Sequence, residues 1–264
     1  MIDKRVFVAM CAILVFTPAS LCVDHQPKEL TAFCAAGLIG PFSEIGQIFK
    51  NSTGINIVFN FDGVQVLRTQ VENGAYADLF VSSSAKHLNA LKAEDIINNS
   101  SISVIAENRV ALIVPKDNPG KIENLSDLAK PDIKIIIGAK DVPIGDYALQ
   151  VLDNLEKDPT YGSEYKNKVL SNIVSEETNV NYILSKVGLG EVDAGFAWQS
   201  KSTEDMEKKI TRIMIPDRYN VIAEYNIGIL KQSEYPKQAE DFINLLKSDK
   251  GIAIQEKYGF KSAL

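Results

Sequence analysis

Segments with strand character alternate with segments with helix character along most of this 264-residue chain. An apolar run over residues 30–36 breaks at Gly37 and is followed by a helical pattern. Alternating apolar residues over 55–61 then lead through the turn pair Asp62 and Gly63 into a second helical pattern. Because parallel strands need long crossover connections, which are usually helices, this alternation predicts an α/β fold with mostly parallel sheets flanked by helices.

The same strand-then-helix order returns in the second half of the chain, which predicts two similar blocks. Further strands are expected over residues 79–81, 109–114, 133–137 and 194–197. Helices are expected over residues 147–155 and 180–187, the second of them capped by Thr178 and Asn179. The polar segments 120–126, 158–165 and 200–209 are expected to be connections rather than linkers between independent domains.

Charge and cysteine content exclude several classes of function. The chain has 28 Lys and Arg against 34 Asp and Glu, a net charge of −6, so it lacks the basic surface that binds nucleic acid. Its three Cys and two His show no metal-ligand spacing, and we expect no metal bound through protein ligands. Cys34 is expected to be the single Cys of the folded body, which allows no internal disulfide.

The N-terminus has the pattern of an export signal. Lys4 and Arg5 precede an uncharged run over residues 6–23, and residues 1–22 are expected to be a signal or lipoprotein-like leader. Residues 19–22 resemble a lipobox, with Leu21 departing from the pattern, so Cys22 is either a lipidated residue or part of a discarded segment. An uncleaved membrane anchor is a further alternative. We expect a periplasmic or cell-surface protein, with lipid anchoring through Cys22 as one form of it.

Motifs of catalysis are absent from the sequence. It contains no GxSxG elbow, no phosphate-binding P-loop and no GxGxxG fingerprint. We expect His87 to be an exposed residue of a helix and Asp62 to form a surface turn. The chain is therefore not expected to be an enzyme and needs no cofactor.

Strands that end in small-residue turns opening into helices recur four times. They lie at residues 36–38, 62–64, 142–145 and 178–180. Each would present free backbone N–H groups at the positive end of a helix dipole, where anions bind. In open α/β sheets these ends line the ligand crevice, so an anion site is one reading and four empty helix ends are the other.

At these same places the chain resembles the molybdate- and tungstate-binding proteins of ABC importers. The matching stretches are AAGL at 35–38, NFDGVQVLRTQVENGAYADLFVSS at 60–83, ENRVALIVPKDNP at 107–119, VPIGDYA at 142–148, GEVDAGFAW at 190–198 and GIAIQEKYGF at 251–260. This resemblance implies the type II solute-binding fold, two α/β lobes with a ligand cleft between them. Lobe one is placed at residues 28–108 and 218–264, and lobe two at 109–217.

Members of that family bind a tetrahedral oxyanion through two Ser hydroxyls, backbone amides and a Tyr hydroxyl. Carried over by resemblance, the two Ser positions are Gly37 and Val64, the amide positions are Ile144 and Val180, and the Tyr position is Trp198. Backbone donors survive at any side chain, and the Trp198 indole N–H can replace the Tyr hydroxyl, although core packing is the alternative role for this Trp. Both Ser hydroxyls are missing here.

The resemblance implies a receptor that binds molybdate or tungstate, closes about a hinge and delivers the anion to a membrane permease and its ATPase. We expect a monomer. Because both Ser donors are replaced, the main alternative is a receptor of the same fold for phosphate, sulfate or a small organic anion. Asp62 would favour a protonated anion such as phosphate if it faced the cleft. An enzyme on the same scaffold, or a sensor that signals by closure, are further alternatives.

Overall fold

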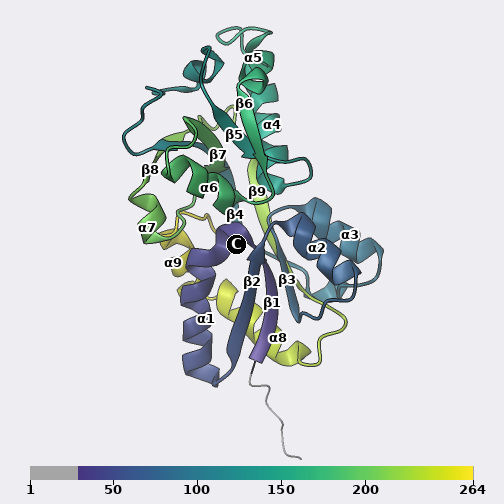
Figure 1. The fold of residues 1–264 in the computed structure, drawn as a ribbon. Helices are drawn as coiled ribbons and strands as arrows, with labels where there is room; N and C mark the ends of the chain where they lie inside the picture. Colours follow the sequence, from purple (N-terminus) through teal and green to yellow (C-terminus); the bar gives the residue numbers. More distant parts are fainter. Residues whose placement is uncertain (1–28, 264) are drawn as a thin grey trace, which may run out of the picture.

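The computed structural model describes residues 29–263. The expected leader over residues 1–22, including Cys22, lies outside the described residues. Within the described part no helix is both long and apolar enough to cross a membrane. Figure 1 shows an elongated α/β molecule with one group of strands and helices below and a second group above, which we name lobe one and lobe two.

Lobe one is built on three parallel strands, with β1 paired to both of the others. These strands are β1 (Glu29–Ala35), β2 (Asn56–Asp62) and β3 (Leu79–Ser82). Its helices are α1 (Ile39–Thr53), α2 (Val64–Glu72), α3 (Ala85–Ala93), α8 (Pro236–Lys247) and α9 (Asp249–Lys257), with short 3₁₀ turns η1 (Ala36–Leu38) and η2 (Asn99–Ser101). The two strand-then-helix units predicted over the first part of the chain are confirmed as β1 with α1 and β2 with α2.

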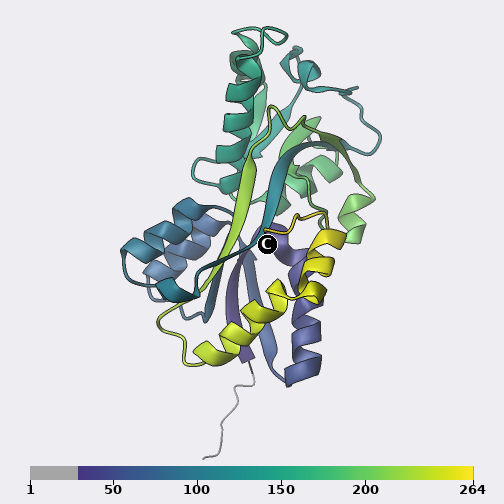
Figure 2. The ribbon, with the colours of Figure 1, turned by 180° about the vertical axis from the view of Figure 1, so that it is seen from behind.

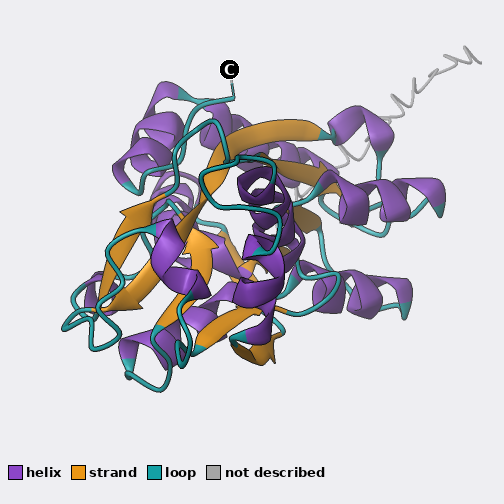
Figure 3. Ribbon diagram, turned by 90° about the horizontal axis from the view of Figure 1, so that it is seen from above, coloured by secondary structure: helices purple, strands orange, loops and turns teal. Residues whose placement is uncertain are grey.

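Lobe two repeats this arrangement with three parallel strands, of which β5 is the middle one. They are β5 (Ile135–Gly138), β6 (Ile173–Glu177) and β7 (Ala194–Trp198), and a further strand is β8 (Ile210–Met214). The helices are α4 (Pro143–Glu156), α5 (Tyr165–Ser171), α6 (Val180–Gly188) and α7 (Glu204–Glu207), with the 3₁₀ turn η3 (Leu125–Ala129). Asn179 caps α6 as expected, because its side chain accepts from the N–H groups of Asn181 and Tyr182. Seen from above, helices cover the strands on both sides (Figure 3).

Two long strands connect the lobes. From Ser103 to Arg109, β4 (Ser103–Pro115) pairs with β9 (Ile222–Ile229), and from Val110 onward it pairs with β7 and β8. Figure 2 shows these two strands side by side as they run from the lower to the upper lobe. The described strands thus form one sheet in the order β2-β1-β3-β9-β4-β7-β5-β6, with β8 on β4. Pairing is parallel in the outer strands, as predicted, and antiparallel wherever β4 or β9 takes part.

The hydrophobic core follows the periodicity of the sequence. In α1 the buried residues include Phe42, Ile45 and Phe49, three to four positions apart, and the helix ends at Gly54 with a left-handed φ of 77°. The ring of Phe242 on α8 packs edge-on against Phe42 and Phe49. Burial of each such ring contributes about 1.5–3 kcal/mol, which holds α8 against α1.

Candidate functional site

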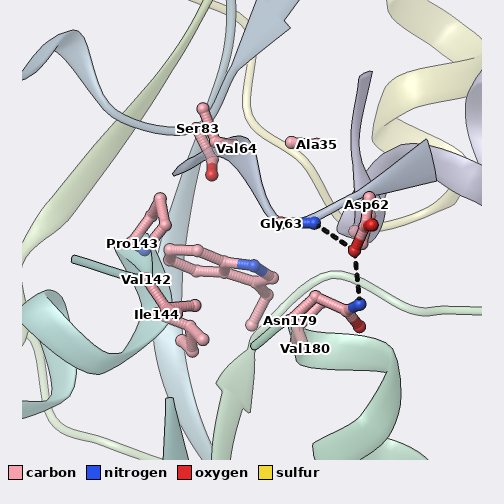
Figure 4. A pocket seen from close by; sticks show the side chains of 13 residues that line it. Ala35, Asp62, Gly63, Val64, Ser83, Val142, Pro143, Ile144, Asn179 and Val180 are labelled. Atoms are coloured by element: carbon pink, nitrogen blue, oxygen red, sulfur yellow. Dashed lines mark hydrogen bonds between the residues drawn. The ribbon is translucent and has the colours of Figure 1, made fainter. Parts of the chain in front are cut away.

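A small cavity lies where the strand ends of lobe one face those of lobe two (Figure 4). Its volume is about 20 Å³, room for little more than one water-sized sphere and far below the roughly 300–1,000 Å³ of pockets that hold drug-sized molecules. Lobe one lines it with the end of β1, the start of η1, the β2–α2 turn and Ser83 after β3. Lobe two contributes the starts of α4 and α6 and the end of β7.

The starts of four helices meet at this cavity. Val64 and Val180 are the first residues of α2 and α6, while Gly37 and Ile144 are the second residues of η1 and α4. All four line the cavity, and N–H groups at these positions have no acceptor within their own helix. The structure therefore brings together the sequence-predicted positions, with Trp198 as the fifth lining residue, from segments spread between residues 37 and 198.

Trp198, the last residue of β7, is packed and yet retains a free donor. Its side chain is 4% exposed and meets the rings of Tyr147 and Tyr225 edge-on at 5.8 and 6.0 Å between centroids. Its carbonyl oxygen accepts from Arg212 Nε at 3.1 Å. Within residues 29–263 its indole N–H has no hydrogen-bond partner, so core packing does not use the polar atom of this side chain.

The indole of Trp198 packs closely against the backbone of Gly37. A Cβ added at Gly37 would lie 3.0 Å from Trp198 Cδ1, 3.3 Å from Trp198 Nε1 and 3.4 Å from the Tyr225 hydroxyl oxygen. The two contacts with Trp198 are tighter than ordinary van der Waals distances, and the contact with Tyr225 is at their lower limit. A side chain at position 37 would therefore require the indole to shift by a few tenths of an ångström.

Ser83 is a site residue that sequence reasoning missed. The run of three serines at 82–84 predicts helix capping. The hydroxyl of Ser82 instead donates to the carbonyl oxygen of Ser84, two residues further on, at 2.6 Å. Ser83 is 3% exposed, lines the cavity and has no side-chain hydrogen bond to any described residue. Figure 4 shows its hydroxyl directed into the cavity, toward the start of α4. Only the position of Ser83 at a strand end could have pointed to this role.

Asp62 lines the cavity, so its expected place in a surface turn is wrong. Its Oδ1 accepts from the Gly63 N–H at 2.7 Å and from Asn179 Nδ2 at 2.8 Å, the latter across the two lobes (Figure 4). A second contact between lobes runs from Gln65 Nε2 to the Thr178 carbonyl at 2.7 Å. Of the described residues that line the cavity, Asp62 alone has a charged side chain. An anion there would be bound by neutral donors.

His87 is buried, which contradicts the expected exposed position on a helix. It is 1% exposed on α3, because the loop that carries Asp141 in lobe two packs over it. Its Nε2 lies 2.8 Å from the Asp141 carbonyl oxygen. Burial lowers the pKa of this imidazole, although the contact with the Asp141 carbonyl opposes the shift.

Metal and thiol chemistry find little support among the described residues. No group of three or more His, Cys, Asp and Glu side chains within residues 29–263 is placed to hold a metal ion. Cys34 is buried in β1, and burial raises the pKa of its thiol, which disfavours the reactive thiolate.

Comparison with known proteins finds relatives along nearly the whole chain. The molybdate-binding protein ModA of Mycobacterium tuberculosis is 28% identical over 234 residues, 88% of this chain and 84% of the relative. ModA of Escherichia coli is 24% identical over 255 residues, 94% of this chain and 95% of the relative.

Solved structures share the fold. The periplasmic molybdate-binding protein of Azotobacter vinelandii superposes with a TM-score of 0.76 at 21% identity, covering 89% of this chain and 100% of that one. The sulfate-binding protein SubI of M. tuberculosis gives a TM-score of 0.79 at 15% identity, covering 89% and 87%. The two-lobed periplasmic-binding-protein fold expected from the sequence is thereby confirmed.

The sequence profile of one family, described as bacterial extracellular solute-binding protein, matches residues 30–261. This match spans both lobes and every residue that lines the cavity. The chain belongs to the family of bacterial extracellular solute-binding proteins.

Proposed function

We propose that this protein is the extracytoplasmic receptor of an ABC importer and binds the tetrahedral oxyanion molybdate or tungstate. The observation that carries the proposal is the set of donors around one small cavity. Four first-turn amides, at Gly37, Val64, Ile144 and Val180, surround it together with the unpartnered polar groups of Ser83 and Trp198. Each hydrogen bond to a charged group contributes about 1.5–3 kcal/mol, enough to hold an anion without a cofactor or a Lys or Arg.

The proposed receptor is a monomer whose lobes close over the anion. We place lobe one at residues 28–108 and 218–264 and lobe two at 109–217, and β4 changes strand partners within one residue of this boundary, between Arg109 and Val110. The loaded protein would deliver its anion to a permease and its ATPase at the membrane. The family supports a location outside the cytoplasm, in the periplasm or at the cell surface, with or without a lipid on Cys22.

A second candidate is a receptor of the same fold for an anion that carries a proton. Asp62 favours it, because a carboxylate at the cavity wall repels a fully deprotonated oxyanion and accepts a hydrogen bond from a protonated one such as hydrogen phosphate. Against it, both Asp62 contacts named above engage Oδ1 and partly offset its charge. Sulfate and small organic anions complete the set to be tested.

A panel of anions followed by thermal unfolding tests both candidates. At about 100 times its Kd a ligand stabilises the folded protein by about 2.7 kcal/mol. For a chain of this size that raises Tm by roughly 5–10 °C. We expect molybdate and tungstate to give this shift and sulfate to give less. A shift with phosphate alone would establish the second candidate instead, and no shift with any anion would refute both.

Ser83→Ala should weaken molybdate binding about tenfold, measured by isothermal titration calorimetry. The hydroxyl has no partner in the described protein, so its removal should change Tm of the empty protein by less than about 1 °C. Ser43→Ala is the matched control, since that hydroxyl donates to the Ile39 carbonyl on the exposed side of α1. Equal affinities of the two variants would show that Ser83 does not contact the anion.

A further inference from the structure

The carboxylate of Asp62 lines a cavity that is proposed to hold an anion, and its contacts give a reason for its place there. Asp62 is the last residue of β2. Its Oδ1 accepts from the Gly63 N–H at 2.7 Å and from Asn179 Nδ2 at 2.8 Å. The first bond lies within lobe one, and the second crosses to lobe two (Figure 4). One oxygen atom thus joins the turn before α2 to the start of α6.

The side-chain amide of Asn179 is fixed in one orientation by its partners. Its Oδ1 accepts from the N–H groups of Asn181 and Tyr182 in the first turn of α6, at 3.0 and 3.3 Å. Turning the amide over would place its NH₂ group against these donors, so Nδ2 must face Asp62. An aspartate would cap the helix equally well but has no hydrogen to donate. Asparagine at position 179 therefore both caps α6 and binds lobe one.

Two further hydrogen bonds join the start of α6 to lobe one. Asn181 Nδ2 donates to the Ala36 carbonyl oxygen at 3.2 Å, where η1 begins. Gln65 Nε2 on α2 donates to the Thr178 carbonyl oxygen at 2.7 Å. Of the three bonds, the one from Asn179 has a charged acceptor, and its donor side chain is only 6% exposed. Charge-assisted bonds are about twice as strong as neutral ones, so this bond contributes most to holding the lobes together.

We infer that Asp62 and Asn179 are positioning residues, whose bond holds the starts of α2 and α6 together at the cavity. The first residues of these helices are Val64 and Val180, which follow the Asp62 turn and the Asn179 cap. This inference rests on the proposed function, because the amides of both valines are donors to the anion there. The carboxylate of Asp62 then strengthens anion binding by closing the lobes, although its charge by itself repels the anion.

Kd values for molybdate, measured by calorimetry, separate the bond from the charge. If the charge of Asp62 dominated, Asp62→Asn would bind about threefold more tightly and Asn179→Asp about threefold more weakly, and the two effects would multiply in the double variant. We expect Asp62→Asn instead to lose about threefold, because its oxygen still accepts from both donors but without the charge. Asn179→Asp should keep the helix cap and lose at least about 30-fold, because two carboxylates then face one another.

The double variant Asp62→Asn with Asn179→Asp exchanges donor and acceptor and keeps the net charge of the original protein. Its amide at position 62 can donate to the carboxylate at position 179. We expect an affinity within about fivefold of the original, whereas the product of the two single effects is a loss of about 100-fold. Asn124→Asp is the matched control. Asn124 caps η3 of lobe two through its side-chain oxygen and does not line the cavity, so the same added charge there should change the affinity less than about twofold.

Binding kinetics give a second readout that a purely electrostatic role would not reproduce. The sequence contains a single Trp, and Trp198 lines the cavity, so stopped-flow fluorescence can follow binding without a label. Loss of a bond that holds the closed lobes raises the dissociation rate. Added repulsion instead lowers the association rate and makes it depend on salt. For Asn179→Asp we expect most of the loss of affinity in the dissociation rate.

Two results would overturn the inference. One is tighter molybdate binding by Asp62→Asn, with single effects that multiply in the double variant. The other is a loss in Asn179→Asp that lies wholly in the association rate and disappears at high salt. Failure of the proposed ligand is distinct from both. If the original protein binds phosphate and not molybdate, the ligand is wrong, and the same cycle with phosphate decides the inference. Binding of no anion refutes the proposed function and this inference with it.

Discussion

Gly63→Ala should lower the affinity for molybdate by about 100-fold or more while leaving the empty protein as stable as before. A Cβ at Gly63 would lie 2.2 Å from the Thr178 carbonyl oxygen, a backbone atom of the opposite lobe. It would also lie 2.5 Å from Gln65 Nε2, whose flexible side chain can move away. The backbone at Gly63, with φ −59° and ψ 131°, suits alanine. The clash therefore arises only when the lobes meet.

Calorimetry gives the loss of affinity, which corresponds to about 2.7 kcal/mol. Small-angle scattering should show the original protein becoming more compact with molybdate and Gly63→Ala remaining extended at the same concentration. Gly188→Ala is the control, because a Cβ there meets the flexible Met206 side chain at 3.2 Å on lobe two and no atom of lobe one among its three nearest neighbours. Full affinity in Gly63→Ala would mean that binding does not require this approach of the lobes.

Trp198→Phe should lower the affinity for the anion at least tenfold, about 1.4 kcal/mol. Phenylalanine keeps an aromatic ring against Tyr147 and Tyr225 and removes the unpartnered indole N–H. Calorimetry measures the affinity. The Tm of the empty protein measures how much stability is lost because the phenylalanine ring is smaller than the indole. Tyr147→Phe is the control, since Tyr147 packs on the same indole without lining the cavity. If Trp198→Phe bound the anion as tightly as the original protein, Trp198 would have only a packing role.

Local structure around the site was predictable from short stretches of sequence. The turns at Gly37, Gly63 and Pro143 each end an apolar run and begin a helix, so their chemistry is contained in a few neighbouring residues. The meeting of these turns at one cavity is not local. That meeting is predicted by the resemblance to the molybdate- and tungstate-binding proteins, because the matching motifs follow one another in the same order along this chain.

Features that depend on the other lobe were missed. His87 looks like an exposed helix residue until the Asp141 loop packs against it, and Asp62 looks like a turn former until Asn179 binds it. Strand β6 was missed for a related reason, because Ser175 and Glu176 give it little apolar character and it is held by pairing with β5. Strands β8 and β9 likewise depend on partners about 100 residues away.

The central place of β9 has a consequence for the order in which the chain can fold. Strand β9 lies between β3 and β4 in the sheet, yet it follows β4 by more than 100 residues in the sequence. Until residues 222–229 are synthesised, β3 and the first half of β4 have unpaired edges, and the apolar face that α8 covers is bare. The contacts of β9 with β3 are slow to form because they close a long loop. Lobe two, which is continuous in sequence over residues 109–217, can assemble first, whereas lobe one stays incomplete until β9 and α8 have been synthesised.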